Sequence, residues 1–265
     1  MLKIEQVGKT FNAGTINEKV AVKGLDLTIN YGDFITVIGG NGAGKSTMLN
    51  LIAGVYIPDE GSIRLDDTDI TRMPEYRRAA LLGRVFQDPM MGTAGDMGIE
   101  ENLAMAYRRG RRHGLGWGIT NAEREFYRER LKTLDLGLED RLTSKVRLLS
   151  GGQRQALTLL MATMNPPKLL LLDEHTAALD PATAEKVLQI TKEVVSRHSI
   201  TTLMVTHNMK NALELGNRTL MMDGGRIVLD VQGEERAGMT VADLLERFRA
   251  GAGKDLDNDR ILLSD

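Results

Sequence analysis

The chain of 265 residues is long enough for one large α/β domain with a sizeable core and an inserted subdomain. Its content of 42% hydrophobic and 26% charged residues is ordinary for a globular protein, and its formal net charge of −2 provides no basic field for a nucleic-acid partner. The chain has no cysteine, which excludes disulfides, thiolate metal sites and cysteine nucleophiles. No stretch approaches the roughly 20 apolar residues that span a bilayer. We therefore expect a cytoplasmic protein that reaches a membrane only through a partner.

The first part of the chain alternates apolar and polar residues as strands do. Residues 2–7 and 20–29 show this pattern, and a turn leads from the second run into a third, apolar run at 34–38. We expect the first two strands to be antiparallel and half-exposed. Phe11 lies between them in an expected loop, where it can either stack on a nucleobase or anchor the loop.

A glycine-rich loop follows the third run, and a helical pattern follows the loop. From Gly39 the residues read G-x-x-x-x-G-K-S, the phosphate-binding pattern in the strand–loop–helix context that it requires. The backbone N–H groups of such a loop bind phosphate oxygens, Lys45 can reach the β- and γ-phosphates, and Ser46 can bind Mg²⁺. A strand–turn–helix that needs glycine only for its shape is the alternative. The predicted nucleotide-binding residues are Gly39, Gly40, Asn41, Gly42, Ala43, Gly44, Lys45, Ser46 and Thr47.

The middle of the chain changes from strands to helices and back. Residues 62–65 are an expected strand, and residues 85–89 read as a strand end that runs into a loop. From about residue 90 to residue 165 the apolar positions recur at helical spacing, which predicts a helical insertion. The sheet is expected to resume at 168–174, where the continuous apolar run at 169–172 predicts a parallel strand that is buried on both faces.

The last part of the chain predicts one more layer of helix and strand. We expect an amphipathic helix at 182–197 and a buried strand at 200–206. A hairpin at 220–229 and a short helix at 241–248 follow. The polar residues from 251 onward are an expected loose tail.

Polar side chains at the carboxyl ends of the parallel strands are the candidates for chemistry, because ligands bind there in parallel sheets. Asp173 can hold Mg²⁺, and Glu174 can polarise a water for in-line attack on the γ-phosphate. His207 can contact the γ-phosphate, and Gln87 can orient water or bind Mg²⁺, although each is more often structural when it stands alone. We expect all four to meet Lys45 at one edge of the sheet.

A second anion-binding pattern lies at residues 149–153, which read Leu-Ser-Gly-Gly-Gln at an expected helix start. One γ-phosphate does not need two such anion-binding sites from one chain. The pattern makes sense if Ser150, Gly151, Gly152 and Gln153 serve a nucleotide that is bound on a second copy of the chain.

With these motifs in this order, residues 1–235 strongly resemble the ATP-binding subunit of ABC transporters. The resemblance implies the roles of the matched positions. They are residues 39–47 as the phosphate loop, Gln87 as the glutamine loop, residues 149–153 as the signature sequence, Asp173 as the carboxylate of the acidic strand, Glu174 as the catalytic glutamate, Asp180 in the loop that crosses the dimer interface, His207 as the switch histidine, and Phe11 as the base-stacking aromatic.

The resemblance also implies the fold and the assembly. The expected fold is an α/β P-loop NTPase core with a mixed or parallel sheet, an N-terminal antiparallel β-subdomain and an inserted α-helical subdomain. One ATPase domain would span residues 1–235, with the helical subdomain at about 90–165, and a short helix and polar tail would occupy 236–265. Two copies would enclose two Mg-ATP head to tail and drive transmembrane permease subunits at the cytoplasmic face of the inner or plasma membrane. An extracytoplasmic substrate-binding protein is a further expected partner.

Two departures from the family pattern indicate the subgroup that the sequence resembles. His175 follows Glu174 where most members have proline, and the helix at 154–164 is almost wholly apolar where the family usually carries arginines. The combination resembles a subgroup that serves importers with lipoprotein-type binding proteins, some of them for amino acids. Methionines at 90, 91, 97 and 105 fall where the family receives a coupling helix of the membrane subunit, although core packing explains any one of them equally well.

Three other functions are alternatives to an importer subunit. An exporter or lipid-handling system also uses separate ATPase subunits. A soluble ABC-type ATPase of DNA repair or translation fits less well, because only 62 residues separate Gln87 from Ser150 and the chain has one cassette. A regulator that binds nucleotide without hydrolysis is disfavoured by the presence of Glu174, Gln87 and His207 together.

Overall fold

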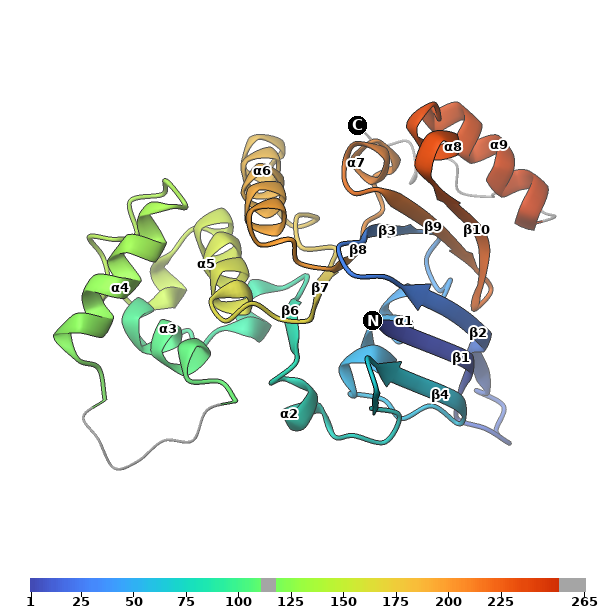
Figure 1. Cartoon of the computed structure of the whole chain (residues 1–265), viewed down its shortest axis with the longest axis horizontal. Helices are drawn as coiled ribbons and strands as arrows, with labels where there is room; N and C mark the ends of the chain where they lie inside the picture. The colour runs from blue at the N-terminus through green and yellow to red at the C-terminus, as the bar shows by residue number, and fades with distance from the viewer. Residues whose placement is uncertain (111–117, 253–265) are drawn as a thin grey trace. The chain divides into compact units, whose positions relative to one another are not determined.

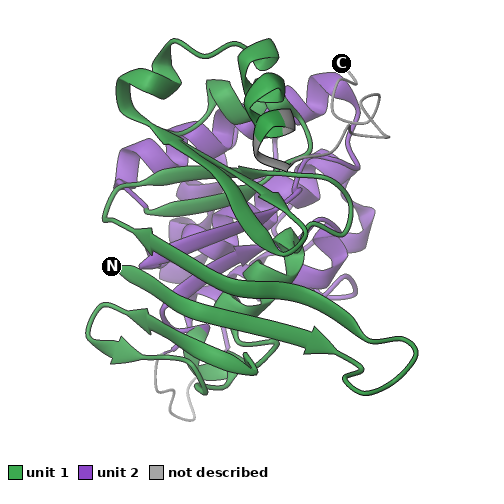
Figure 2. Ribbon diagram, turned by 90° about the vertical axis from the view of Figure 1, so that its right-hand side faces the viewer, with its two compact units in different colours: residues 1–78, 201–265 green, residues 79–200 purple. Residues whose placement is uncertain are grey.

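The computed structural model describes residues 1–110 and 118–252. The chain divides into two compact units (Figure 2). The first unit is Met1–Arg78 together with Thr201–Asp265, and the second unit is Ala79–Ile200. Among the described residues, no helix is long and apolar enough to cross a membrane.

The first unit contains an antiparallel sheet that confirms the expected N-terminal strands (Figure 1). The strand predicted at 2–7 continues to Phe11, so the prediction that Phe11 lies in a loop is wrong. A backbone irregularity at Gln6, whose φ is 48°, shifts the register and interrupts the alternation, but pairing resumes beyond it. The strand order is β2-β1-β4-β5, with β1 at Leu2–Phe11, β2 at Lys19–Ile29, β4 at Glu60–Leu65 and β5 at Thr68–Asp69.

A second group of strands in the first unit is mostly parallel. Every residue of β3 (Phe34–Ile38) is buried, because the strand lies between two parallel neighbours, β8 (Thr202–Val205) and β9 (Arg218–Asp223). The expected hairpin is confirmed, since β10 (Arg226–Gln232) pairs antiparallel with β9. The helices of this unit are α1 (Lys45–Ala53), α2 (Glu75–Arg78), α7 (Met209–Glu214), α8 (Gly233–Ala237) and α9 (Val241–Ala252).

The expected C-terminal helix is present and longer than predicted. Thr240 begins α9 with a reciprocal cap, because its side chain accepts a hydrogen bond from the Asp243 amide while the Asp243 carboxylate accepts one from the Thr240 amide. Leu244 and Phe248 are buried against Ile38 and Met221 of the sheet. The helix runs to Ala252, so the prediction of a loose tail is wrong for residues 251 and 252, and its remaining residues, 253–265, lie outside the described part.

The second unit contains the buried apolar strand and the helical insertion. As expected, β7 (Leu169–Asp173) pairs in parallel with β6 (Leu82–Val85), and its four leucines are completely buried. All the described elements between β6 and β7 are helical, which confirms the inserted helical subdomain as part of the fold class. They are η1 (Pro89–Gly92), α3 (Ile99–Tyr107), α4 (Asn121–Lys132), η2 (Val146–Leu148) and α5 (Gly151–Thr163), and α6 (Pro181–His198) follows β7.

Candidate nucleotide site

The phosphate loop connects β3 to α1 in the first unit, as predicted. At Gly44 the backbone has a φ of 103°, and a Cβ there would lie 2.6 Å from the Ala21 carbonyl oxygen, so only glycine fits. The buried Lys45 ammonium folds back onto the loop and donates hydrogen bonds to the carbonyl oxygens of Gly39 (2.7 Å) and Gly40 (3.1 Å). The cation is therefore held by the loop whose N–H groups the sequence assigns to phosphate.

His207 lies at the same sheet edge as the phosphate loop. The parallel strands β3 and β8 pair Val37 with Val205, and the Thr206 amide donates to the Val37 carbonyl oxygen at 3.0 Å. Gly39 and His207 each follow this pair by two residues. The structure thus brings these two predicted site residues to the carboxyl ends of neighbouring strands, where the sequence placed them.

Phe11 ends β1 opposite Lys19, the first residue of β2. Its ring packs edge-on against Tyr56 with centroids 5.1 Å apart. The Lys19 ammonium lies 3.7 Å from the position that a Cβ on Gly42 would take, so the end of this strand pair is close to the phosphate loop. Base stacking on Phe11 stays a prediction, and this arrangement is compatible with it.

A second group of predicted residues lies at a sheet edge of the second unit. The parallel strands β6 and β7 pair Val85 with Leu172, and Gln87 and Glu174 each follow that pair by two residues. Asp173 ends β7, and its carboxylate is 3.9 Å from the Arg84 guanidinium. These residues are therefore neighbours, as the sequence predicted.

The backbone at Glu174 is unusual for a residue with a side chain. Its φ of 42° is left-handed, a conformation that costs a non-glycine residue on the order of 1–3 kcal/mol and is concentrated at functional sites. The following His175 is 2% exposed, and its Nε2 is 3.1 Å from the Thr191 hydroxyl oxygen. Because that hydroxyl donates its own proton to the Val187 carbonyl, Nε2 is the donor to Thr191. Burial lowers the pKa of His175 to about 4, so the ring is neutral near pH 7.

The signature residues form the exposed start of α5. The Ser150 side chain accepts a hydrogen bond from the Gln153 amide, and the Gln153 side chain accepts one from the Ser150 amide, both at 3.2 Å. A Cβ on Gly152 would lie 2.1 Å from the Thr183 methyl group, so this position has no room for a side chain. Ser150 and Gly151 are exposed, and the helix N-terminus that they open faces solvent within this unit.

Asp180 caps the neighbouring helix, α6. Its carboxylate accepts a hydrogen bond from the Thr183 amide at 3.1 Å, and the hydrogen bonds from Thr183 hold its pKa below the usual range. Thr183 also touches Gly152, and a Cβ on Gly151 would lie 3.1 Å from the side chain of Leu179. The signature sequence and the loop that ends at Asp180 are therefore packed together.

The side chains predicted to bind Mg²⁺ offer the oxygen atoms that this ion prefers as ligands. Among the described residues, no group of three His, Cys, Asp or Glu side chains could hold a metal ion. The candidate ligands Ser46, Gln87 and Asp173 all offer oxygen, and Mg²⁺ is usually held by one or two such groups together with substrate phosphates and water. These side chains are therefore chemically compatible with the Mg²⁺ of a metal–nucleotide complex.

Several contacts in these two groups have no signal in the motifs. Lys19 reaches the phosphate loop only because β1 and β2 pair in this register. The Gln155 amide donates to the Phe86 carbonyl oxygen at 3.2 Å, which ties the signature helix to the residue before Gln87. Long-range strand pairing could have suggested Lys19 beside Phe11, but no local pattern predicts the Gln155 contact.

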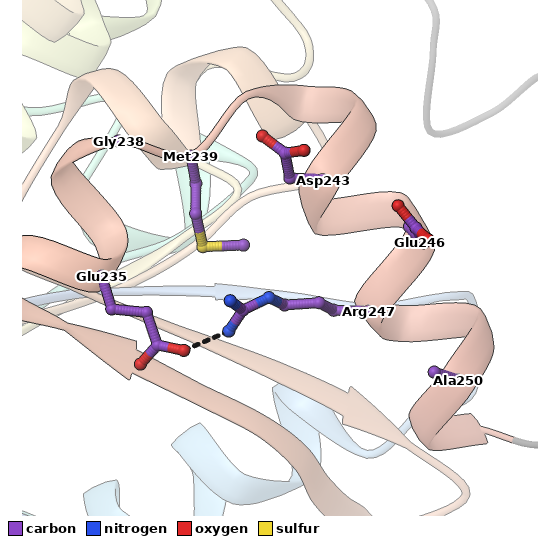
Figure 3. Close-up of a pocket in the computed structure, with 7 residues that line it drawn as sticks. All are labelled: Glu235, Gly238, Met239, Asp243, Glu246, Arg247 and Ala250. Atoms are coloured by element: carbon purple, nitrogen blue, oxygen red, sulfur yellow. Dashed lines mark hydrogen bonds and ion pairs between the residues drawn. The ribbon is translucent and has the colours of Figure 1, made fainter.

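An open hollow between α8 and α9 is separate from these residues (Figure 3). It is lined mainly by charged side chains, and Arg247 forms an ion pair with Glu235 across it. Its other lining residues are Gly238, Met239, Asp243, Glu246 and Ala250, and none of the predicted site residues is among them.

The fold and the phosphate loop define a P-loop ATPase cassette, and comparisons with known proteins identify the family. The family described as ABC transporter matches residues 22–177. The "Tyrosine transport ATP-binding protein" of Clostridioides difficile is 43% identical over 94% of this chain and 98% of its own length. "Methionine import ATP-binding protein MetN" of Corynebacterium diphtheriae is 35% identical over 86% of this chain, which spans 64% of that protein.

Solved structures agree with the sequence comparisons. A dimeric post-hydrolysis state of the ATP-binding cassette MJ0796, bound to ADP and Pi, has a TM-score of 0.76 and 29% identity, and the match covers 88% of this chain and 98% of that one. An ADP conformation of the cassette MJ1267 has a TM-score of 0.76 and 27% identity over 94% of this chain and 98% of that one. The chain belongs to the ABC transporter family as an ATP-binding subunit, and its activity is that of an ATPase.

Proposed function

We propose that two copies of the chain bind two Mg-ATP head to tail and hydrolyse them to import a small solute, such as an amino acid, through transmembrane permease subunits. The observation that carries the proposal is the helix start at Ser150, where Ser150 and Gly151 are exposed, a second anion-binding end in a chain that already has a phosphate loop. The names of the relatives, which refer to tyrosine transport and methionine import, support import and an amino-acid cargo.

In the proposed site the phosphate loop holds the nucleotide and two strand ends supply the reacting groups. The loop amides and the Lys45 ammonium bind the β- and γ-phosphates, and Phe11 stacks on the base. Ser46, Gln87 and Asp173 would hold Mg²⁺, which would supply positive charge to the phosphates. Glu174 accepts a proton from the attacking water, and His207 donates a hydrogen bond to the γ-phosphate. The products are ADP and inorganic phosphate.

The partner copy completes the site in this proposal. The γ-phosphate bound to the phosphate loop of one copy faces the signature residues of the other copy, which are Ser150, Gly151, Gly152 and Gln153. Asp180 lies at the interface between the two copies. The packing of Gly152 against Thr183 supports a fixed relation between the signature and the Asp180 loop. Both would thus approach the partner together, so that closure of the dimer would depend on ATP in both sites.

The helical subdomain is the proposed contact with the permease. Met91 is 69% exposed and Met105 is 48% exposed, although both are apolar, and Met90 is also exposed. Methionine side chains adapt to a partner helix, and their exposure favours a docking role over core packing for these three. We place the protein at the cytoplasmic face of the membrane through this contact, with an extracytoplasmic substrate-binding protein as the further partner of the transporter.

Replacing Glu174 by glutamine tests the proposed chemistry. Because a general base contributes about 10²–10⁴-fold, Glu174→Gln should lower the ATPase rate at least 100-fold, retain ATP binding and accumulate an ATP-bound dimer. Phosphate release and size-exclusion chromatography with and without ATP measure these effects. Glu193→Gln, on the exposed face of α6, is the matched control and should behave like the wild type. A normal ATPase rate in Glu174→Gln would exclude the role of Glu174, and a monomer in saturating ATP would contradict the dimer.

A further inference from the structure

Lys19 is a cation at the phosphate loop that no motif includes. It opens β2 and is the strand partner of Phe11, the last residue of β1. Its ammonium lies 3.7 Å from the place of a Cβ on Gly42, in the middle of the phosphate loop. Lys19 is therefore opposite Phe11 in the strand register, and its ammonium is close to the phosphate loop.

The charge of Lys19 is not committed to a protein partner. Among the residues that the structure describes, the Lys19 ammonium has no hydrogen-bond or ion-pair partner, and the residue is exposed. The neighbouring charged groups have protein partners of their own, and the Lys9 ammonium also lies over the Phe11 ring, 5.8 Å from its centroid. The Lys9 ammonium bonds the Asp59 carboxylate at 2.7 Å and holds the pKa of that carboxyl below its usual range, and Glu18 accepts a hydrogen bond from the Gly14 amide at 2.7 Å.

The order of groups in a nucleotide matches this arrangement. With the base on Phe11 and the β- and γ-phosphates in the loop at Gly39–Ser46, the ribose and the α-phosphate must lie between the two. Lys19 lies between these two ends of the nucleotide, since it is the strand partner of Phe11 and its ammonium reaches Gly42. An ammonium group is a strong donor to phosphate oxygen and a poor partner for a neutral base.

We propose that Lys19 is a nucleotide-binding residue whose ammonium contacts the α-phosphate of ATP and ADP. The inference rests on the proposed nucleotide site and adds one ligand to it. The contact is independent of the γ-phosphate, so it contributes equally to substrate and product. Lys19 thereby strengthens the binding of nucleotide without favouring either the ATP or the ADP state of the cycle.

Replacing Lys19 by methionine removes the charge and keeps the length of the side chain. We expect Lys19→Met to weaken both ATP and ADP binding about fivefold at low salt, as for a charge-assisted contact at a partly exposed site. Lys19→Arg should retain most of the affinity. The difference between Lys19→Met and the wild type should shrink at high salt, because exposed charges are screened. Titration calorimetry with ATP and with ADP at two salt concentrations measures all of this.

The controls separate this inference from the site on which it rests. Lys3→Met removes the same charge at the other end of β1, where Lys3 pairs with Glu5, and should bind nucleotide like the wild type. Lys45→Ala should abolish tight binding, and if it does not, the proposed nucleotide site itself is wrong. If Lys45→Ala abolishes binding but Lys19→Met matches Lys3→Met, the role of Lys19 is overturned. A loss in Lys19→Met that is confined to ATP, or that persists unchanged at high salt, would also overturn an α-phosphate contact.

Discussion

Arg78 is the buried charge on which the phosphate-loop helix depends most. Its side chain is 0% exposed, and its guanidinium donates to the carbonyl oxygens of Leu51 (2.7 Å) and Ile52 (2.8 Å) in the last turn of α1. It also donates to the carbonyl oxygens of Met73 (2.8 Å) and Thr71 (3.1 Å). The side chain thus satisfies carbonyl groups that a helix end leaves without partners. Burial lowers the pKa of Arg78 to about 10, so it remains charged at pH 7.

The expected loss follows from these four hydrogen bonds. Arg78→Met keeps an apolar stem but leaves the buried carbonyl groups without donors, and each such group costs about 1–3 kcal/mol. Since water can enter the space of the missing guanidinium and the effects are not additive, we expect a loss of about 3–5 kcal/mol, the range for removing one partner of a buried charged network. At 2–4 °C per kcal/mol, the midpoint of thermal unfolding should fall by roughly 6–20 °C.

Arg77→Met is the matched control, because Arg77 is adjacent in sequence, exposed, and placed over the ring of Tyr76. It should change stability by less than about 1 kcal/mol. Thermal unfolding compares the two variants, and amide hydrogen exchange shows whether protection is lost first in α1. Equal midpoints for Arg78→Met and Arg77→Met would refute the reasoning, as would normal protection of α1 in Arg78→Met.

Two further predictions concern the second unit. Burial lowers the pKa of His175 to about 4, whereas a histidine in the unfolded chain titrates near pH 6.5. The unfolded state therefore binds the proton first as the pH falls. The neutral His175 contributes about 3 kcal/mol to the free energy of unfolding, and this contribution should be full above pH 6.5 and lost toward pH 4. Urea unfolding of metal-free protein should show this pH dependence in the wild type and less of it in His175→Gln, and identical pH dependences would contradict it. Ser150→Arg should block the anion-binding start of α5, abolish hydrolysis and leave ATP binding to a monomer intact, whereas loss of ATP binding in that monomer would disprove the role in the partner's site.

The sequence predicted the elements well where one local pattern was sufficient. The apolar run that became β7 is buried as expected, the run at 34–38 forms the strand β3, and the glycine pattern at Gly39 lies between strand and helix as its motif requires. The extent of β1 was missed, because the irregularity at Gln6 hides a strand that continues to Phe11. A pattern of period two cannot show pairing that resumes in a shifted register.

The candidate site was predictable as a set of residues but not as a geometry. The positions of Gln87 and Glu174 at one edge follow from parallel strands, and the structure has them there. The left-handed backbone of Glu174 and the approach of Lys19 to Gly42 depend on tertiary packing, which the spacing of residues in the sequence does not show. The same holds for His175, whose departure from the usual proline is visible in the sequence while its bond to Thr191 is not.

In the proposed function, the residues assigned to nucleotide binding and those assigned to hydrolysis fall mostly in different units. The proposed phosphate ligands Lys45 and Lys19 belong to the first unit, whereas Glu174 and the signature at Ser150 belong to the second. If the proposed roles hold, we expect the first unit to bind the phosphates and Glu174 to be needed for activation of the water. Changes in the first unit should thus act on nucleotide affinity, and changes at Glu174 or Ser150 should act on turnover with affinity preserved. A variant of the second unit that lost ATP affinity as completely as Lys45→Ala would show that binding already requires both units, and the separation would fail.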